Sequence, residues 1–295
     1  MVLRATTALG CLMLTACIPA SHADEPPAPQ VHPTIVSLNP CADAILAEVA
    51  DPAQILALSP YSRDPRSSSM DVRLARRFGT TRGTVEEVLA LRPDVVVDST
   101  FVAPATAQAY ARLGLRLETS GMAATLDQAR AQVRALARVA GHPDRGEALV
   151  ARIDAALAAA APPANAAPIS AVLWQSGGIV PGADTLASDL LTHTGFANFS
   201  ALRGMNQADR LPLERMLADP PRVILLASAS EGARAEDDRA LAHPALRSLS
   251  GTTRAAFAPN LLYCGGPTII RAAARLAEVR RALLARTGTP VRAAR

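Results

Sequence analysis

Residues 85–96 read VEEVLALRPDVV and residues 213–224 read LERMLADPPRVI, and the two segments align without a gap. In each, a run of good helix formers leads into a proline-containing turn and then into a short aliphatic run that is typical of a buried strand. Such a unit also recurs by chance in α/β proteins. The similar position of the two copies in the two halves of the chain favours a real repeat, and it predicts two related α/β lobes.

Around each copy, short β-branched or aliphatic runs alternate with helical patterns, which is typical of α/β units with parallel strands. The expected strands are 34–38, 55–58, 94–97 and 115–118 in the first lobe, and 169–174, 223–227 and 255–258 in the second. The expected helices are 41–49, 71–77, 84–91, 104–113, 126–140, 147–161, 183–193, 212–218, 236–241 and 267–286.

These elements divide the 295 residues into parts of ordinary domain size. An N-terminal α/β lobe is expected at 34–124 and a C-terminal α/β lobe at 168–287, followed by a tail at 288–295. Between the lobes lies a helical segment, 125–163, whose second helix would extend roughly 20 Å and connect them.

The N-terminus has the layout of a secretory signal, with Arg4 before an apolar run and small residues after it. Residues 1–23 are therefore expected to be removed on export. A second processing site competes, because Cys17 lies in a lipoprotein-like sequence and would become a lipid anchor, the only attachment to a membrane that we expect. The proline-rich residues 24–33 are interpreted as a flexible leader.

Composition argues against several classes of protein. All 30 basic residues are arginine, they are scattered among 26 acidic ones, and no basic stripe with aromatics occurs, so nucleic-acid binding is not expected. Ser176 lacks the glycine pattern of a nucleophile elbow, and no catalytic residue is predicted. No metal site or cofactor is predicted either, because no metal-ligand spacing occurs among the histidines, which are His22, His32, His142, His193 and His243.

Aromatic residues make up only 3% of the chain, and four of them follow the ends of expected strands. Ligands of open α/β sheets bind beyond the carboxyl ends of the strands. We therefore predict ligand contacts from Tyr61, Phe101, Trp174 and Tyr263, and from Arg63 beside the first of them, which would pair with an anionic group. Core packing of each aromatic is the alternative.

Four motifs carry a resemblance to a known family: TIVSLNP at 34–40, SPYSR at 59–63, Gly83 followed by residues 86–94, and the helix that begins at Pro267. From about 34 to 284 the chain resembles the periplasmic substrate-binding proteins of iron-chelate and cobalamin ABC importers. The resemblance implies two α/β lobes with central parallel sheets, joined by a single long helix, and a ligand cleft between the lobes.

The resemblance also implies a function without catalysis. A monomeric periplasmic protein would deliver a metal chelate to an ABC permease and its ATPase, with Glu86 and Glu214 docking into arginine pockets of the permease. The expected ligand is a ferric siderophore, followed by cobalamin and then haem. Cobalamin binders of this family have more tryptophans in the cleft than this chain, which has one. For haem, Tyr61 or Tyr263 would be the iron ligand. The alternatives are an exported α/β enzyme that uses the same cleft and a solute-sensing lipoprotein.

Two cysteines, Cys41 and Cys264, lie in the expected folded part, each after a strand. Export to an oxidising compartment makes a disulfide one interpretation. Two unpaired thiols and direct ligands to a metal or its chelate are the other two.

Overall fold

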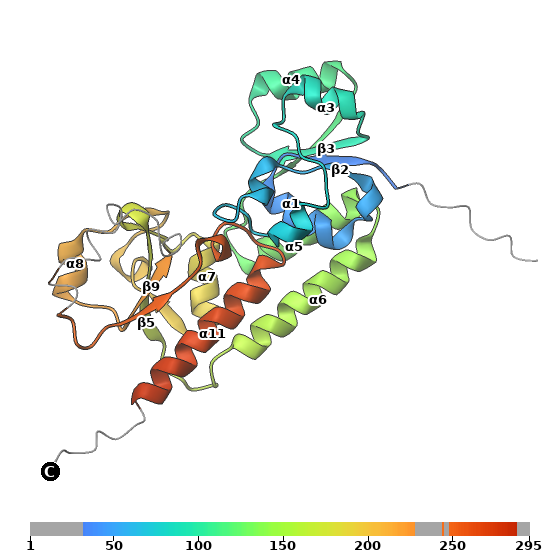
Figure 1. Cartoon of the computed structure of the whole chain (residues 1–295). Coiled ribbons are helices and arrows are strands. Elements are labelled where there is room, and N and C mark those ends of the chain that lie inside the picture. The colour runs from blue at the N-terminus through green and yellow to red at the C-terminus, as the bar shows by residue number, and fades with distance from the viewer. Residues whose placement is uncertain (1–31, 228–243, 245–247, 288–295) are drawn as a thin grey trace, which may run out of the picture. The chain divides into compact units, whose positions relative to one another are not determined.

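In the computed structural model, the described residues are 32–227, 244 and 248–287 (Figure 1). The predicted signal peptide, leader and tail lie outside this range, apart from the last two residues of the leader, and so does the helix expected at 236–241. The described strands form two sheets, one from each half of the chain, and helices connect them. This arrangement confirms the predicted two-lobed α/β class.

The first sheet is wholly parallel and has the order β2-β1-β3-β4. Its central strands begin with buried apolar runs, Ile35–Val36 and Val95–Val97, as expected for strands covered on both faces. The bounds are β1 Ile35–Ser37, β2 Ile55–Ala57, β3 Val95–Ser99 and β4 Arg116–Ser120. The four strands expected for the first lobe are therefore present, each shifted by no more than a residue or two.

Helices cover both faces of this sheet. Successive side chains of a strand point to opposite faces, so neighbouring residues of one strand pack against different helices. Val96 packs with Val88 and Tyr110, whereas Val95 and Val97 belong to the larger core that includes residues of the first and fifth helices. These helices are α1 Pro40–Val49, α2 Val72–Ala75, α3 Val85–Leu91, α4 Pro104–Arg112 and α5 Leu126–Val139.

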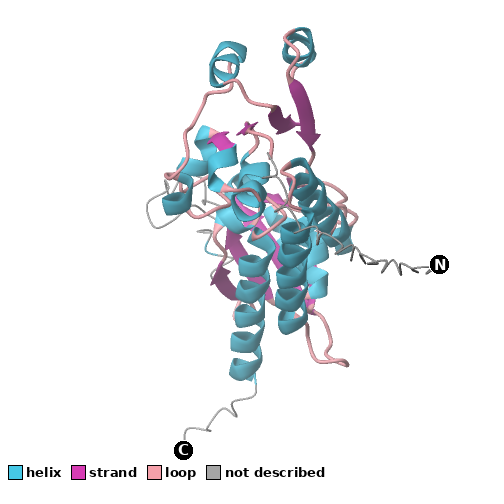
Figure 2. Ribbon diagram, turned by 90° about the vertical axis from the view of Figure 1, so that its right-hand side faces the viewer, coloured by secondary structure: helices cyan, strands magenta, loops and turns pink. Residues whose placement is uncertain are grey.

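After α5 the chain turns at Gly141, whose φ of +82° favours glycine, and restarts as α6, Pro143–Ala160. Proline is favoured in the first turn of a helix, which explains why α6 begins earlier than the expected residue 147. Its 18 residues extend about 27 Å. Figures 1 and 2 show α6 alongside α11, Thr268–Thr287, and the two helices are in contact.

The second sheet repeats the order of the first, because its parallel strands lie as β7-β5-β9-β10. Two short strands, β6 and β8, extend it in antiparallel fashion. The bounds are β5 Ile169–Gln175, β6 Ile179–Val180, β7 Phe196–Asn198, β8 Asp209–Arg210, β9 Val223–Ala227 and β10 Thr253–Ala256. The sequence did not predict β6, β7 or β8, which are too short for a periodic pattern.

The sequence repeat has a structural counterpart in the two helices that precede β3 and β9. Helix α3 leads into β3, and α8, Leu213–Ala218, leads into β9. Val88 and Met216, which occupy equivalent positions of the repeat, are the fully buried side chains of their helices. In each sheet the strand after this helix pairs with the first strand of the lobe. The two copies therefore hold equivalent positions in the two lobes.

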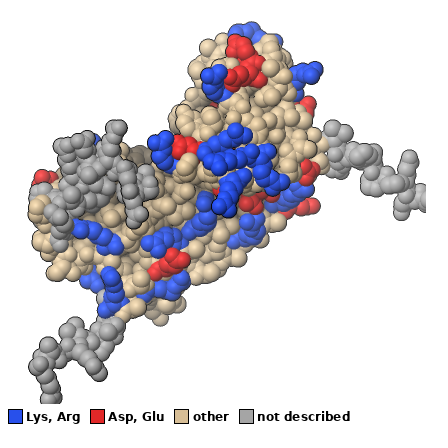
Figure 3. Space-filling view, viewed as in Figure 1, with Lys and Arg blue, Asp and Glu red and all other residues tan. Residues whose placement is uncertain are grey.

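The surface carries arginines with acidic side chains between them (Figure 3). Exposed arginines are frequent in one segment after β2, which includes Arg66, Arg73, Arg76 and Arg77. Arg66 is paired with Asp64 in an ion pair of 3.0 Å. None of the described helices combines the length and the apolar character that a membrane span requires.

Candidate functional site

A pocket of about 460 Å³ is lined by residues of both lobes. This volume lies in the range of small-molecule sites in proteins. Its lining includes Cys41, Met122 and Gln132 from the first half of the chain and Gln175, Asp184 and Tyr263 from the second.

Strand ends explain why these residues meet. Cys41 lies in the first turn of α1, which follows β1, and Met122 follows β4. Gln175 is the last residue of β5. The carboxyl ends of parallel strands meet at one edge of a sheet, where α/β proteins bind their ligands. Met122 and Gln175 were not predicted as site residues, although the same rule would have selected both.

The lining is mostly uncharged. Among the described residues it contains three amides, Gln132, Gln175 and Gln207, and a single carboxylate, Asp184. The Gln132 amide nitrogen donates to the Ser120 hydroxyl at 2.7 Å and to the Gly121 carbonyl at 2.7 Å, which fixes its orientation. The pocket therefore offers hydrogen-bonding groups and apolar surface to a ligand, with little fixed charge.

Tyr263 is the one predicted aromatic that lines the pocket. Its side chain is 45% exposed, and burial of the remainder raises the pKa of the phenol. The phenol is therefore protonated at neutral pH, and it is accessible to a ligand. Met122, which is 77% exposed, brings a thioether to the same pocket.

Two other predicted aromatics lie outside the residues that line the pocket. Tyr61 follows β2 and Phe101 follows β3, so both lie at the same edge of the first sheet as Met122. Their side chains are 61% and 76% exposed, respectively. The structure thus places both at the cleft edge without bringing them into the pocket.

Trp174 was predicted to contact the ligand, but it does not line the pocket. Its side chain is only 2% exposed and packs in a core cluster with Phe199 and Met216. Successive residues of a strand face opposite sides, so burial of Trp174 turns the next residue, Gln175, toward the pocket. Arg63 is not among the pocket residues either, and its guanidinium donates to the Phe78 carbonyl.

The turn that carries Tyr61 and Arg63 is fastened to a buried carboxylate. Asp43 accepts a hydrogen bond from the Ser59 backbone at 3.0 Å and one from the Ser62 hydroxyl at 2.6 Å. Burial is the largest influence on this carboxyl and raises its pKa to about 7, although the hydrogen bonds act in the opposite direction. Sequence reasoning missed Asp43, because burial of an acid is decided by tertiary packing.

Cys41 and Cys264 form a disulfide in the structure, with their Cα atoms 5.1 Å apart. This is one of the three interpretations that the sequence left open. The segment after Cys264 lies against the first lobe, and a Cβ added at Gly266 would approach the Ile45 side chain within 2.6 Å. The disulfide and this close approach fasten the lobes together at one side of the pocket.

Hydrogen bonds add to this attachment. The backbone of Leu126 donates to Asp189 of α7, Leu186–His193, at 2.7 Å. The Thr268 hydroxyl donates to the Ser69 carbonyl at 3.2 Å. Both bonds join residues of the first lobe or of α5 to the second half of the chain.

The two glutamates of the repeat lie on the surface. Glu86 is in the first turn of α3 and Glu214 in the first turn of α8. Both side chains are exposed, and neither carboxylate forms a hydrogen bond or an ion pair with another described residue. A carboxylate in the first turn of a helix is stabilised by the helix dipole, which is one reason for their position.

Comparison with known proteins agrees with this fold. Residues 35–253 match the model of a family described as periplasmic binding protein. No curated protein matches the chain significantly. The solved structures that resemble it include the periplasmic haem-binding protein RhuT from Roseiflexus sp. RS-1 in apo form. It is 20% identical with a TM-score of 0.64, and the match covers 86% of this chain and 98% of that one.

Two similar structures come from Vibrio cholerae. The periplasmic haem-binding protein HutB is 17% identical with a TM-score of 0.69, over 85% of this chain and 99% of that one. The periplasmic vitamin B12-binding protein BtuF is 22% identical with a TM-score of 0.63, over 85% and 97%.

The two matching sheets, the connecting helix and the pocket between the lobes define a two-lobed binding protein. The chain belongs to the periplasmic binding protein family.

Proposed function

We propose that this protein captures a metal chelate in the pocket between its lobes and delivers it to an ABC permease. The observation that carries the proposal is the pocket itself, which both lobes line at the carboxyl ends of their strands. Family membership supports a binding role. Haem and vitamin B12 are the ligands named for the similar structures, and both are metal chelates.

The lining suits a chelate whose edge is largely uncharged. In the part of the chain that the structure describes, amides and apolar groups line the pocket together with Tyr263, and Asp184 is its one acidic side chain. A tyrosine oxygen is a known axial ligand of haem iron. A ferric siderophore, cobalamin and haem are the three ligands to test, and Tyr263 is the residue that we propose to contact the ligand in each case.

The proposed role is binding without turnover. Within the described residues, the pocket lining holds one carboxylate and no histidine, and its two cysteines are joined to each other. General acid–base catalysis needs a positioned proton donor or acceptor of suitable pKa, commonly as a pair. This lining supports a carrier better than the alternative of an exported enzyme.

In this proposal, Glu86 and Glu214 dock the protein to the permease that receives the ligand. Their equivalent positions on α3 and α8 place one exposed carboxylate on each lobe. Two separated charges fix the orientation of a complex and speed its formation. We propose that both dock into basic sites of the permease.

The ligand is identified by purifying the protein from its own periplasm, followed by native mass spectrometry and absorbance spectroscopy. Ferric siderophores, cobalamin and haem differ in mass and in colour, so one bound molecule per chain assigns the class. Failure of all three to bind the ligand-free protein, or turnover of any of them, would contradict the proposal.

A substitution in the pocket tests the assigned contact. Tyr263→Phe removes the phenol oxygen and is expected to weaken ligand binding about tenfold, as measured by titration calorimetry. Tyr110→Phe is the matched control, because the Tyr110 hydroxyl is buried in the first lobe without a hydrogen-bond partner. If the two variants bind the ligand with equal affinity, Tyr263 does not contact the ligand.

A further inference from the structure

A second group of polar side chains lies away from the pocket. His32 precedes β1, Asp51 follows α1, and His142 lies in the turn between α5 and α6. Each offers one ligand atom, and these atoms all lie within 4.8 Å of one another. We call these three residues the His-Asp cluster. The spacing of the histidines in the sequence does not reveal it, because only the fold brings these segments together.

The cluster is separate from the candidate ligand site. None of its members lines the pocket between the lobes. Helix α1 has ten residues and extends about 15 Å. Cys41, which lines the pocket, lies in its first turn, whereas Asp51 follows its last residue, Val49.

The geometry of the cluster is compact. The two imidazole rings lie with their centroids 4.1 Å apart, and the His142 Nε2 atom lies 3.3 Å from an oxygen of Asp51. Gly141 makes room for the first ring, because a Cβ at this position would lie 2.4 Å from the His32 Nδ1 atom. All three side chains are partly buried.

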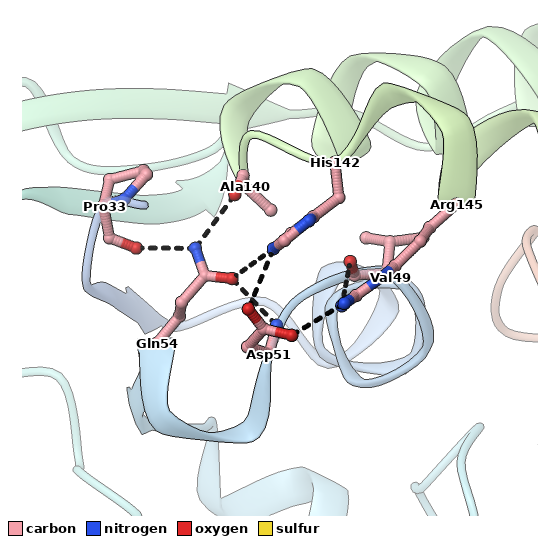
Figure 4. Close-up of polar contacts among 7 residues, drawn as sticks. All are labelled: Pro33, Val49, Asp51, Gln54, Ala140, His142 and Arg145. Carbon is pink, nitrogen blue, oxygen red and sulfur yellow. Dashed lines mark hydrogen bonds and ion pairs between the residues drawn. The ribbon is translucent and has the colours of Figure 1, made fainter. Parts of the chain in front are cut away.

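Neighbouring groups hold the cluster in place (Figure 4). The Gln54 side chain is almost fully buried, and its amide nitrogen donates to the carbonyls of Pro33 at 3.0 Å and Ala140 at 2.9 Å. Its amide oxygen therefore faces His142 Nε2, at 2.8 Å. The same oxygen accepts a hydrogen bond from the Asp51 backbone N–H at 2.8 Å, so Gln54 holds Asp51 and His142 next to each other.

Asp51 is oriented by a separate contact. Arg145 donates to one carboxylate oxygen at 2.8 Å, and the other oxygen faces His142 (Figure 4). Hydrogen bonding of the second oxygen of a ligating carboxylate is common around metal sites. The positive charge of Arg145 opposes a cation, and the negative charge of Asp51 offsets it.

Two imidazoles and a carboxylate form a ligand set that zinc prefers. Zinc binds these groups at about 2.0 to 2.2 Å, so its ligand atoms lie roughly 3 to 4 Å apart. In the cluster the ligand atoms all lie within 4.8 Å of one another, which is within about 1 Å of the spacing that zinc requires. Hard ions such as magnesium prefer all-oxygen sites and fit this set less well.

We propose that the His-Asp cluster binds a divalent transition metal ion, with zinc as the best match. The ion connects the segment before β1 to the end of α1 and to the turn between α5 and α6. It thereby stabilises the first lobe without contacting the transported ligand.

The test uses the mature protein without a tag, freed of metal by chelator. Titration calorimetry with Zn²⁺ is expected to show one ion per chain, and Mg²⁺ is expected not to bind. His32→Ala and His142→Ala should each weaken Zn²⁺ binding at least tenfold. His193→Ala is the matched control, because His193 is an exposed histidine at the end of α7, and it should leave binding unchanged.

A thermal scan gives a second readout, since an ion that binds only the folded state raises the melting temperature. Zn²⁺ should raise it for the wild type and for His193→Ala, but not for His32→Ala. His32 is the decisive position if His142→Ala fails to fold, because His32 lies before the first strand, whereas His142 lies in the turn between two helices. Absence of Zn²⁺ binding, or equal binding by wild type and His32→Ala, would overturn the proposal and leave the cluster a hydrogen-bonded network.

Discussion

At the scale of single residues, Asp43 connects burial with pH dependence. The usual pKa of an aspartate is 3.8, and burial raises that of Asp43 to about 7. The folded protein therefore holds this proton more tightly than the unfolded chain does. The resulting stabilisation is fully present below a pH of about 4 and is lost as the pH rises through about 7.

Asp43→Asn is expected to remove this dependence. An asparagine keeps an oxygen that accepts from Ser59 and Ser62 but does not ionise. Between about pH 5 and pH 8 the wild type should lose about 2 kcal/mol of unfolding free energy relative to the variant. Urea unfolding at both pH values measures this difference. Parallel pH profiles of the two proteins would show that Asp43 is not the titrating group.

At this scale the structure places two of the predicted ligand contacts in different surroundings. Tyr263 lines the pocket, whereas Trp174 is buried, and ligand contact by Tyr263 stays a prediction. The alternation of side chains along β5 predicts that Trp174 and Gln175 face opposite sides of the sheet. It does not predict which of these sides is buried by other parts of the chain. The cover comes from Val180 of β6 and from residues more distant in the sequence, such as Phe199 and Met216, and only the fold brings these side chains to the indole.

At the scale of elements, the repeat was the strongest signal in the sequence. It predicted equivalent helix-turn-strand units, and the structure places α3 with β3 and α8 with β9 in matching positions of two sheets of the same order. The long elements were predictable because their apolar period is clear. The strands β6 and β8 have two residues each, and they form because a partner strand is adjacent.

The equivalent helices lead to a prediction about transport. Replacing Glu86 and Glu214 together by arginine is expected to lower uptake of the ligand in cells at least tenfold, because both contacts with a basic partner become repulsive. Ligand affinity of the purified variant should remain within about twofold of wild type, since neither residue lines the pocket.

Neighbouring residues supply the control for this experiment. Glu87 is adjacent to Glu86 but is already paired, because it accepts from the Thr81 hydroxyl at 2.7 Å and forms an ion pair with Arg82 at 3.2 Å. Glu87→Gln is therefore expected to affect uptake much less than the double reversal. Normal uptake by the doubly reversed variant would show that the permease does not use these glutamates.

At the scale of the whole molecule, the Cys41–Cys264 disulfide joins parts of the chain 223 residues apart. In the loop-entropy account, a connection over so long a loop stabilises the folded protein by up to about 5 kcal/mol, and measured effects are commonly about 2 to 4 kcal/mol. The disulfide also closes one side of the pocket, which both cysteines line. It should therefore limit how far the lobes separate.

Replacing both cysteines by serine separates these two effects. The unfolding free energy is expected to fall by about 2 to 4 kcal/mol. Hydrogen exchange should increase around residues 262–266, because the covalent attachment of this segment to α1 is lost. Ligand should dissociate faster from the variant, since wider opening of the lobes exposes the pocket. Reduction of the wild type with a thiol reagent is the matching control and should reproduce all three changes. A ligand release rate that stays the same while stability falls would show that the remaining contacts, such as those of Thr268 with Ser69 and of Leu126 with Asp189, suffice to hold the lobes together.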